Sequence, residues 1–437
     1  MAITTHETDT DIQDRAILVS LVTDEIKRTG LDPEYSLQEL VQLAETAGVE
    51  VLDVLRQNKE TPDSRWFIGK GKVEEVRMAA EALGANTAIF DQELSGAQVR
   101  NLEEALDLKI IDRTQLILDI FAGRAKTREG IIQVELAQLS YLLPRLSGHG
   151  KNLSRLGGGI GTRGPGESKL ETDRRHIRDR IGELKRQLDE VVKTRTLHRE
   201  RRRKSGAVQV ALVGYTNAGK STLLKQLTDA DVYIENQLFA TLDPTSRAFE
   251  LPGGKEVVLT DTVGFIQNLP HEVVAAFRAT LEEVNEASLV LHVVDASSPN
   301  REKQMEVVQR ILGELGAAGK PQIVLFNKID VCSPEQREML PTGPGYLKIS
   351  AFSPDDLARV AEAVQDELSG ETLTFRIPGN RGDLSSLLYR VGDVLDQTFD
   401  GSDILYHVRL NKDDYGKWGY QLAEYVDESA EQPAEES

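Results

Sequence analysis

Gly214-Tyr215-Thr216-Asn217-Ala218-Gly219-Lys220-Ser221 is the most informative stretch of this sequence, because its residue types fit a phosphate-binding loop. It follows an apolar run at 208–213 that predicts a buried strand, and it opens a helical pattern at 222–227. Glycine lets the backbone curl until its N–H groups point at a phosphate, and the helix N-terminus adds favourable partial charge. We expect Lys220 to bridge the β- and γ-phosphates of a nucleotide and Ser221 to coordinate Mg²⁺.

A second motif predicts which base that nucleotide carries. Asn327-Lys328-Ile329-Asp330 stands directly after the apolar run 322–326. A carboxylate at the end of a strand can accept two hydrogen bonds from N1–H and the N2 amino group of guanine, and adenine lacks both donors. Asp330 therefore predicts a guanine nucleotide. Ser350-Ala351-Phe352 is expected to complete the pocket by giving a backbone N–H to the base.

Two segments between these motifs have the features of nucleotide-sensing switches. In Asp261-Thr262-Val263-Gly264, we expect Asp261 to hold Mg²⁺ through water and the Gly264 N–H to meet the γ-phosphate. Phe239-Ala240-Thr241-Leu242-Asp243 lies where the other switch belongs. Thr241 is the expected second Mg²⁺ ligand, and Thr245 is a competing candidate that spacing alone does not exclude. Lys220, Thr241 and Gly264 are the predicted catalytic residues.

The residue directly after the second switch motif is Phe265. In Ras-like proteins a glutamine at this position orients the attacking water. A phenyl ring neither donates a hydrogen bond to water nor accepts one from it. We therefore expect GTP hydrolysis to be slow in the isolated protein and to depend on a partner.

Length and composition restrict the class of protein. The chain has 437 residues and a net charge of −19, which argues against a general nucleic-acid binder. Cys332 is the only cysteine, so an intrachain disulfide framework is excluded and a reducing cytosol is indicated. The polar start of the chain has no features of a secretory signal, and no apolar window is long enough to span a membrane. We expect a cytoplasmic monomer whose membrane contact, if any, is peripheral.

The remaining sequence predicts a multidomain α/β protein. Strands at 16–22, 49–54, 87–90 and 109–111 alternate with helices, which is typical of a small α/β domain. Near the end, 373–377 and 404–410 are predicted strands with a helix at 384–399 between them. The expected organisation is a disordered lead 1–14, an N-terminal α/β domain 15–125, a helical hairpin 126–204, a Ras-like P-loop GTPase domain 205–370, a C-terminal α/β domain 371–426 and a disordered acidic tail 427–437.

The predicted hairpin gathers positive charge within an acidic chain. Residues 116–143 have a mainly helical pattern, and 147–167 form a glycine-rich loop. The second arm has the seam of a two-stranded coiled coil, at Ile177, Ile181, Leu184, Leu188 and Val191. It also contains many basic side chains: Arg174, Arg175, Arg178, Arg180, Lys185, Arg186, Lys193, Arg195, Arg199 and 201–204. A charge run is usually a solvated helix face, but this concentration favours contact with a polyanion such as RNA.

The combined motifs resemble the HflX family of translation-factor-related GTPases over nearly the whole chain. They are GYTNAGKS at 214–221, FATLDPT at 239–245, DTVGF at 261–265, NKID at 327–330, DRTQLILDIFAGRA at 112–125 and GGIGTRGPGESKLETDRR at 158–175. The resemblance implies a GTPase that binds the large ribosomal subunit and splits or rescues ribosomes under stress. It implies that the N-terminal domain and hairpin reach ribosomal RNA and that the ribosome stimulates hydrolysis.

The sequence differs from some members of the family at two places, and two alternative functions remain open. Some relatives carry Trp-Thr-His-Leu-Glu-Arg before the glycine loop, where this chain has a different sequence at 148–155. Some also bind ATP in the N-terminal domain, but Gly69-Lys70-Gly71-Lys72 is no P-loop. The alternative functions are a GTPase that regulates a protein or membrane partner without the ribosome, and an RNA-binding protein with a vestigial nucleotide site. The intact Lys220, Ser221, Asp261 and Asp330 argue against the second alternative.

Overall fold

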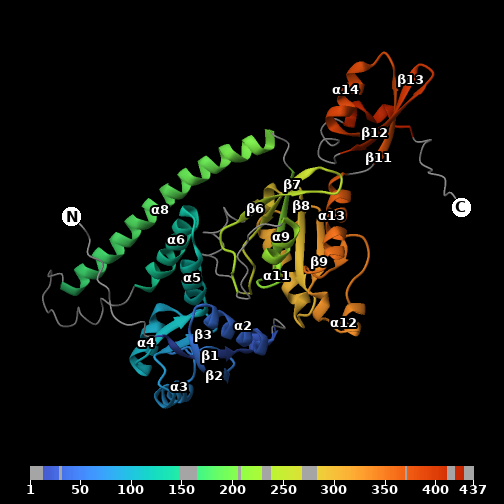
Figure 1. The fold of residues 1–437 in the computed structure, drawn as a ribbon. Coiled ribbons are helices and arrows are strands. Elements are labelled where there is room, and N and C mark those ends of the chain that lie inside the picture. The colour runs from blue at the N-terminus through green and yellow to red at the C-terminus, as the bar shows by residue number, and fades with distance from the viewer. Residues whose placement is uncertain are drawn as a thin grey trace.

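The computed structural model describes residues 13–28, 32–146, 165–204, 208–228, 238–267, 283–369, 372–410 and 419–427. Almost all of the expected disordered lead, glycine-rich loop and acidic tail therefore lies outside the described residues. A central α/β domain lies between an N-terminal domain and a C-terminal domain, and a long two-helix arm runs beside it (Figure 1). Within the described ranges, no helix has the length and apolar character needed to cross a membrane.

The N-terminal domain is built on a four-stranded parallel sheet of order β2-β1-β3-β4. Its strands are β1 (Arg15–Val22), β2 (Glu50–Asn58), β3 (Thr87–Phe90) and β4 (Lys109–Asp112). Its helices are α1 (Asp24–Arg28), α2 (Pro33–Thr46), α3 (Lys70–Leu83), α4 (Gly96–Leu106) and α5 (Arg113–Arg124). The expected alternation of strands and helices is confirmed, although β2 is longer than the sequence pattern indicated.

Side chains of β1 alternate between two cores because successive residues of a strand point to opposite faces. Ala16 and Leu18 pack with α2 and α5, whereas Ile17, Val19 and Leu21 pack with α3 and α4. Both faces of the sheet are therefore covered by helices, as is usual for a buried parallel sheet.

The helical pattern at 116–143 proves to be two helices, α5 and α6 (Arg128–Arg145), with a break at 125–127. Thr127 caps α6, and its Oγ1 accepts a hydrogen bond of 2.9 Å from Gly130 N. The mainly helical character of 116–143 is confirmed, and the side-chain cap at Thr127 accounts for the break between the two helices.

The arm consists of α6 packed against α8 (Pro165–Lys204), as Figure 1 shows. The expected seam residues Ile181, Leu184 and Leu188 form a cluster with Ile132, Leu136 and Leu139 of α6. Arg180 Nε donates to Glu135 Oε1 at 2.7 Å, and its Nη2 donates to Glu135 Oε2 at 2.8 Å. The predicted helical hairpin is therefore present, with α8 extending well beyond α6.

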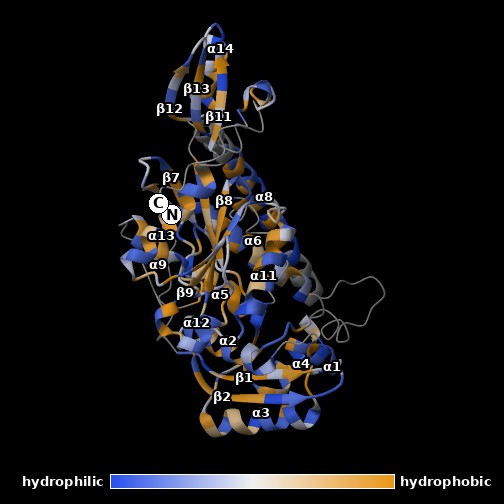
Figure 2. Cartoon of the chain, turned by 90° about the vertical axis from the view of Figure 1, so that its right-hand side faces the viewer, coloured by the Kyte–Doolittle hydropathy of each residue, from blue (hydrophilic) through white to orange (hydrophobic). Residues whose placement is uncertain are grey.

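The central domain has a six-stranded sheet of order β10-β9-β8-β5-β7-β6, in which only β6 is antiparallel to its neighbour. Its strands are β5 (Val208–Gly214), β6 (Thr245–Glu250), β7 (Glu256–Asp261), β8 (Leu289–Asp295), β9 (Gln322–Asn327) and β10 (Tyr346–Lys348). The strand β8 is largely hydrophobic, as Figure 2 shows. The named helices of this domain are α9 (Lys220–Thr228), α11 (Arg301–Glu314), α12 (Pro334–Glu338), α13 (Pro354–Ser369) and the short 3-10 helix η2 (Ile329–Val331).

The C-terminal domain lies at the end of the central domain that faces away from the N-terminal domain (Figures 1 and 2). Its antiparallel sheet has the order β11-β13-β12. The elements are β11 (Thr372–Pro378), α14 (Gly382–Val391), β12 (Gly392–Asp400), β13 (Asp403–Leu410), η3 (Gly419–Gln421) and η4 (Ala423–Tyr425).

The predicted helix at 384–399 is wrong in its second half. The helix α14 ends at Val391, and residues from Gly392 onward form β12, which pairs along its length with β13. A Cβ on Gly392 would lie 2.6 Å from Val408 Cγ1 and 2.8 Å from Arg409 O, so the strands meet closely there. Pairing with a partner strand that the local pattern does not reveal overrides the helical spacing.

Candidate functional site

The phosphate-binding loop connects β5 to α9 and is fixed to the segment that follows β7. Thr216 N donates to Phe265 O at 2.7 Å, and Phe265 N donates to Gly214 O at 3.1 Å. Gly214 and Gly219 have φ angles of 156° and 96°, a region that disfavours side chains. A Cβ on Gly219 would lie 2.3 Å from Asn327 Nδ2, so this turn requires glycine for space as well.

Lys220 lies fully inside this loop. Its Nζ donates to Gly214 O at 3.1 Å and to Tyr215 O at 2.9 Å. Burial lowers its pKa to about 8, while the nearby Asp261 carboxylate acts in the opposite direction. A buried cation enclosed by backbone is suited to a phosphate, which would supply the negative charge that two carbonyls lack.

Three oxygen-bearing side chains meet beside the loop. Ser221 Oγ donates to Asp261 Oδ2 at 2.6 Å and lies 2.7 Å from Thr241 Oγ1. Asp261 Oδ1 is buried and has no hydrogen-bond partner among the described residues. Burial raises the Asp261 pKa, against the effect of Lys220. Mg²⁺ prefers oxygen ligands, so the donor set and the unsatisfied oxygen fit a magnesium ion.

The two threonine candidates occupy different places. Thr241 is in contact with Ser221, whereas Thr245 begins β6 and pairs in the sheet with Asp261. The geometry favours Thr241 as the ligand, and that role remains a prediction.

A pocket forms where the loop and the two switch segments meet. It is lined by Thr216, Asn217, Gly219, Lys220, Ser221, Thr222, Phe239, Ala240, Thr241, Thr262 and Gly264. Gly264 approaches the loop closely, because a Cβ there would lie 2.9 Å from Thr216 Cα. By contrast Leu242 and Val263, from the same predicted set, are buried in a hydrophobic core.

Asn327 connects the base-recognition motif to the loop. Its Nδ2 donates to Ala218 O at 2.9 Å, and its Oδ1 accepts from Ala351 N at 3.0 Å. Lys328 Nζ donates to Asp295 Oδ2 at 2.7 Å. The Asp330 side chain is exposed and makes no hydrogen bond or ion pair within the described part of the chain, so its carboxylate is available to a ligand.

The Ser350-Ala351-Phe352 segment lies beside this motif, but its N–H groups already have partners. Ser350 N donates to Asp356 Oδ2, Ala351 N to Asn327 and Phe352 N to Ser350 Oγ. The Phe352 side chain is 72% exposed. A direct hydrogen bond from this segment to the base therefore stays a prediction.

Phe265 does not face the nucleotide pocket. Its side chain is only 1% exposed and packs with Val213, Val284 and Val290 in a core of the central domain. The ring is therefore a structural residue, and it does not line the nucleotide pocket.

The pocket is also held by the N-terminal domain, which the sequence did not reveal. Tyr215 OH donates to Glu39 Oε1 at 2.5 Å and accepts from Gln267 N at 2.8 Å. Arg113 is buried between Glu39 and Asp91 and donates to both. Arg113 belongs to the quoted DRTQ stretch, but only the fold brings its two acidic partners together.

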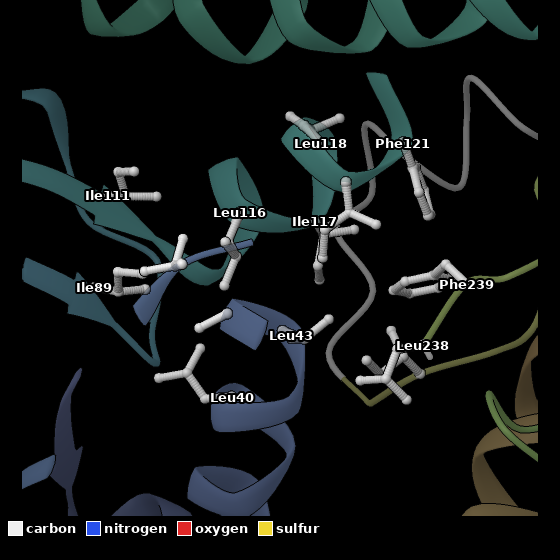
Figure 3. Close-up of a cluster of buried hydrophobic side chains, with 14 of the residues drawn as sticks. Leu40, Leu43, Ile89, Ile111, Leu116, Ile117, Leu118, Phe121, Leu238 and Phe239 are labelled. Atoms are coloured by element: carbon white, nitrogen blue, oxygen red, sulfur yellow. The ribbon is translucent and has the colours of Figure 1, made fainter. Parts of the chain in front are cut away.

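The switch segment 238–243 is part of the same interface. Leu238 and Phe239 enter a core with Leu40, Leu43 and Phe121 of the N-terminal domain (Figure 3). The rings of Phe121 and Phe239 meet edge to face, with centroids 4.7 Å apart. The predicted nucleotide-binding residue Asp243 directs its carboxylate to the start of α6, where it accepts from Lys126 N and Thr127 N, both at 2.9 Å.

The N-terminal Gly69-Lys70-Gly71-Lys72 stretch opens α3. Gly69 is the residue preceding the helix, and Lys72 pairs with Glu75 at 2.7 Å. The stretch forms the first turn of α3, and its sequence lacks the P-loop pattern.

Three protein-family models match the chain in succession. They are described as GTP-binding GTPase N-terminal at residues 34–122, GTP-binding GTPase middle region at 124–202 and 50S ribosome-binding GTPase at 209–328. The boundaries between the matched segments fall near the start of α6 and near β5.

Relatives that match over most of their length share the same description, GTPase HflX. The protein of Caldanaerobacter subterraneus subsp. tengcongensis is 50% identical over 395 residues, covering 90% of each chain. That of Alkalihalophilus pseudofirmus is 48% identical over 400 residues, covering 91% of this chain and 94% of its own. That of Escherichia coli is 44% identical over 386 residues, covering 87% and 89%. With similarity of this extent added to the P-loop and guanine-recognition motifs, the chain belongs to the HflX family of GTPases, which bind GTP and hydrolyse it to GDP and phosphate.

Proposed function

We propose that this GTPase binds the large ribosomal subunit through its N-terminal domain and arm, and that the ribosome accelerates GTP hydrolysis. The central domain, residues 205–370, acts as the switch in this proposal. Stalled or idle ribosomes would be split or rescued under stress, and the protein would work as a cytoplasmic monomer.

The observation that carries the proposal is the exposed positive charge along α8. Arg175, Arg178, Lys185, Arg186 and Lys193 are exposed, whereas the apolar seam of the same helix faces α6. Cations spaced along a projecting helix suit the phosphates of folded RNA, despite the net negative charge of the chain. The 50S ribosome-binding description of the matched family supports the large subunit as the source of that RNA.

The buried Phe265 supports dependence on a partner. A GTPase needs a group that orients the attacking water, and this ring lies in a core, away from the pocket. The ribosome would supply or position that group.

Each site residue has a role in the proposal. Lys220 holds the β- and γ-phosphates, Asp330 selects guanine and Gly264 N–H contacts the γ-phosphate. Ser221 and Thr241 are the proposed Mg²⁺ ligands, with Asp261 holding the ion through water. Bound Mg²⁺ would neutralise charge on the phosphates, and the surrounding loop would keep them in place.

The test is steady-state GTP hydrolysis by the full chain, with and without purified large ribosomal subunits, at several salt concentrations. We expect strong stimulation that weakens as salt rises, because phosphate contacts release counterions. Arg178→Glu and Lys185→Glu should each weaken stimulation and flatten its salt dependence, with turnover of the free protein unchanged.

Arg310→Glu is the matched control, since Arg310 is an exposed cation on α11 of the central domain. Equal losses in Arg310→Glu and Arg178→Glu would contradict a specific role for the arm. Turnover that ribosomal subunits do not change would reject the proposal and favour a GTPase with a protein activator.

A further inference from the structure

The proposed metal ligand Thr241 is held on both sides by the N-terminal domain. Phe239, two residues before it, packs its ring against Phe121 of α5. Leu242, directly after it, is buried in the same core. Thr241 therefore sits in a short segment whose neighbours are anchored outside the GTPase domain.

Asp243 provides a polar anchor in this segment. Its Oδ2 accepts hydrogen bonds from Lys126 N and Thr127 N, both at 2.9 Å, and its Oδ1 accepts one from Thr127 Oγ1. Thr127 is the N-cap of α6, the first helix of the arm. A carboxylate at the start of a helix also interacts favourably with the partial positive charge of its free N–H groups.

Gly130 provides the space for this contact. A Cβ at this position would lie 2.5 Å from Asp243 Oδ1 and 3.1 Å from Thr127 Oγ1. The glycine stands in the first turn of α6, where alanine would otherwise favour the helix. Close approach of Asp243 therefore accounts for a glycine at a position where helix propensity disfavours it.

We propose that Asp243 is a positioning residue that couples Thr241 to the base of the arm. In the structure Thr241 contacts Ser221 while Asp243 accepts hydrogen bonds from the amides of Lys126 and Thr127 at the start of α6. When Thr241 binds the metal in the GTP state, Asp243 holds Lys126 and Thr127. When hydrolysis releases Thr241, the segment loosens and the hydrogen bonds from the Lys126 and Thr127 amides to Asp243 are lost.

The coupling acts in both directions because linkage between two sites is reciprocal. Binding of the arm to a ribosome that holds α6 in this position favours Thr241 at the metal. GTP bound at the site in turn favours the position of α6 that binds the ribosome. This inference rests on the metal-binding role proposed for Thr241, and it extends that role to the α5–α6 junction.

Hydrogen exchange reports the coupling directly. The amides of Lys126 and Thr127 donate to Asp243, so their exchange measures whether the contact is formed. In the full chain with Mg²⁺, we expect these amides to exchange at least about 5-fold more slowly with a non-hydrolysable GTP analogue than with GDP, the lower end of typical couplings. In Asp243→Ala, exchange should be fast with both nucleotides.

Kinetics separate positioning from a merely structural role. Asp243→Ala should lower kcat about 5-fold or more and raise the Mg²⁺ concentration needed for half-maximal turnover by a similar factor, following the same coupling. KM for GTP and the affinity for GDP should change by less than about 2-fold, because the proposed coupling ties the contact to the metal-engaged state. Asp243→Asn keeps one acceptor oxygen and should recover part of kcat.

Gly130→Ala tests the same contact from the N-terminal side without changing any residue of the nucleotide site. It should reproduce the exchange and Mg²⁺ effects of Asp243→Ala. Gly123→Ala is the matched control, since Gly123 is a helical glycine of α5 with nothing within 4 Å of a Cβ. Gly123→Ala should behave as the unmodified protein.

Two results would overturn the coupling and leave the metal-binding role of Thr241 standing. One is nucleotide-independent exchange of Lys126 and Thr127 in the unmodified chain. The other is normal kcat and Mg²⁺ dependence in both Asp243→Ala and Gly130→Ala. Failure of the site itself looks different, since Thr241→Ala would then leave hydrolysis and its Mg²⁺ requirement unchanged. That last result removes the role of Thr241 and the coupling through it.

Discussion

The phenolic hydroxyl of Tyr215 donates a hydrogen bond to Oε1 of Glu39 across a distance of 2.5 Å. The contact joins the second residue of the phosphate-binding loop to α2 of the N-terminal domain. Glu39 is buried, and burial raises its pKa in spite of the adjacent Arg113 guanidinium. Loss of any hydrogen-bond partner of this carboxylate should therefore reduce the stability of both domains.

Tyr215→Phe removes only the hydroxyl. It leaves Glu39 with fewer donors and Gln267 N without its acceptor, so we expect the free energy of unfolding to fall by about 1–3 kcal/mol. Urea unfolding of the full chain measures this loss. Tyr346→Phe is the control, because the Tyr346 ring stacks on Phe326 and its hydroxyl has no partner within the described residues. Similar losses in the two variants would argue against the Glu39 contact.

Asp330→Asn tests base selection. The amide replaces one acceptor by a donor, so the hydrogen bonds to guanine N1–H and N2 are no longer matched. We expect GTP affinity to fall more than about 10-fold and affinity for xanthosine triphosphate, which has an oxygen at C2, to rise. Fluorescent-nucleotide competition measures both. Glu306→Gln on α11 is an exposed carboxylate control, and unchanged preference in Asp330→Asn would exclude Asp330 as the base-selecting residue.

Phe265→Gln places an amide in the hydrophobic core where the ring packs. We expect a loss of stability of about 2–4 kcal/mol, with no faster hydrolysis by the free protein. Phe265→Leu keeps an apolar side chain and should retain most of the stability. Thermal unfolding and phosphate release give the two quantities. Faster hydrolysis in Phe265→Gln would show that the side chain at this position reaches the pocket.

We expect the protein to lose stability at acidic pH because of the buried His292. It is buried in β8, its Nδ1 has no partner among the described residues, and burial lowers its pKa to about 4. The unfolded chain, with an ordinary histidine pKa, binds the proton first as pH falls. The stability is therefore fully present above about pH 6.5 and is lost towards pH 4, by up to about 3 kcal/mol.

Urea unfolding at pH 7 and pH 5 measures this effect. His292→Phe should lose part of the pH dependence, whereas His176→Gln on the exposed side of α8 should keep all of it. Identical pH profiles in the unmodified chain and in His292→Phe would rule out His292 as the source.

The sequence was most informative where function requires a contiguous motif. Phosphate and base recognition use residues that are neighbours in the chain, so the P-loop and Asn327–Asp330 could be predicted from the sequence alone. The switch from α14 to β12 at Gly392 was missed. It depends on pairing with the strand β13, which lies elsewhere in the chain.

The interface between the two domains could not be predicted for a related reason. Arg113, Glu39 and Tyr215 are far apart in sequence, and each has an ordinary local explanation. The ion pairs of the buried Arg113 can be recognised only once the fold has placed Glu39 and Asp91 beside it. The choice between Thr241 and Thr245 had the same dependence, because the start of β6 decides which threonine lies near Ser221.

The shared core of Figure 3 has a consequence for folding during synthesis. The N-terminal domain leaves the ribosome first, yet its core includes Leu238, Phe239 and Ile266, which are made much later. At usual elongation rates the apolar faces of α2 and α5 wait on the order of ten seconds for these residues. The core of the N-terminal domain is therefore completed only when these residues of the nucleotide-binding domain have been made. A nascent chain stopped before residue 238 would leave the apolar faces of α2 and α5 exposed, where chaperones could bind.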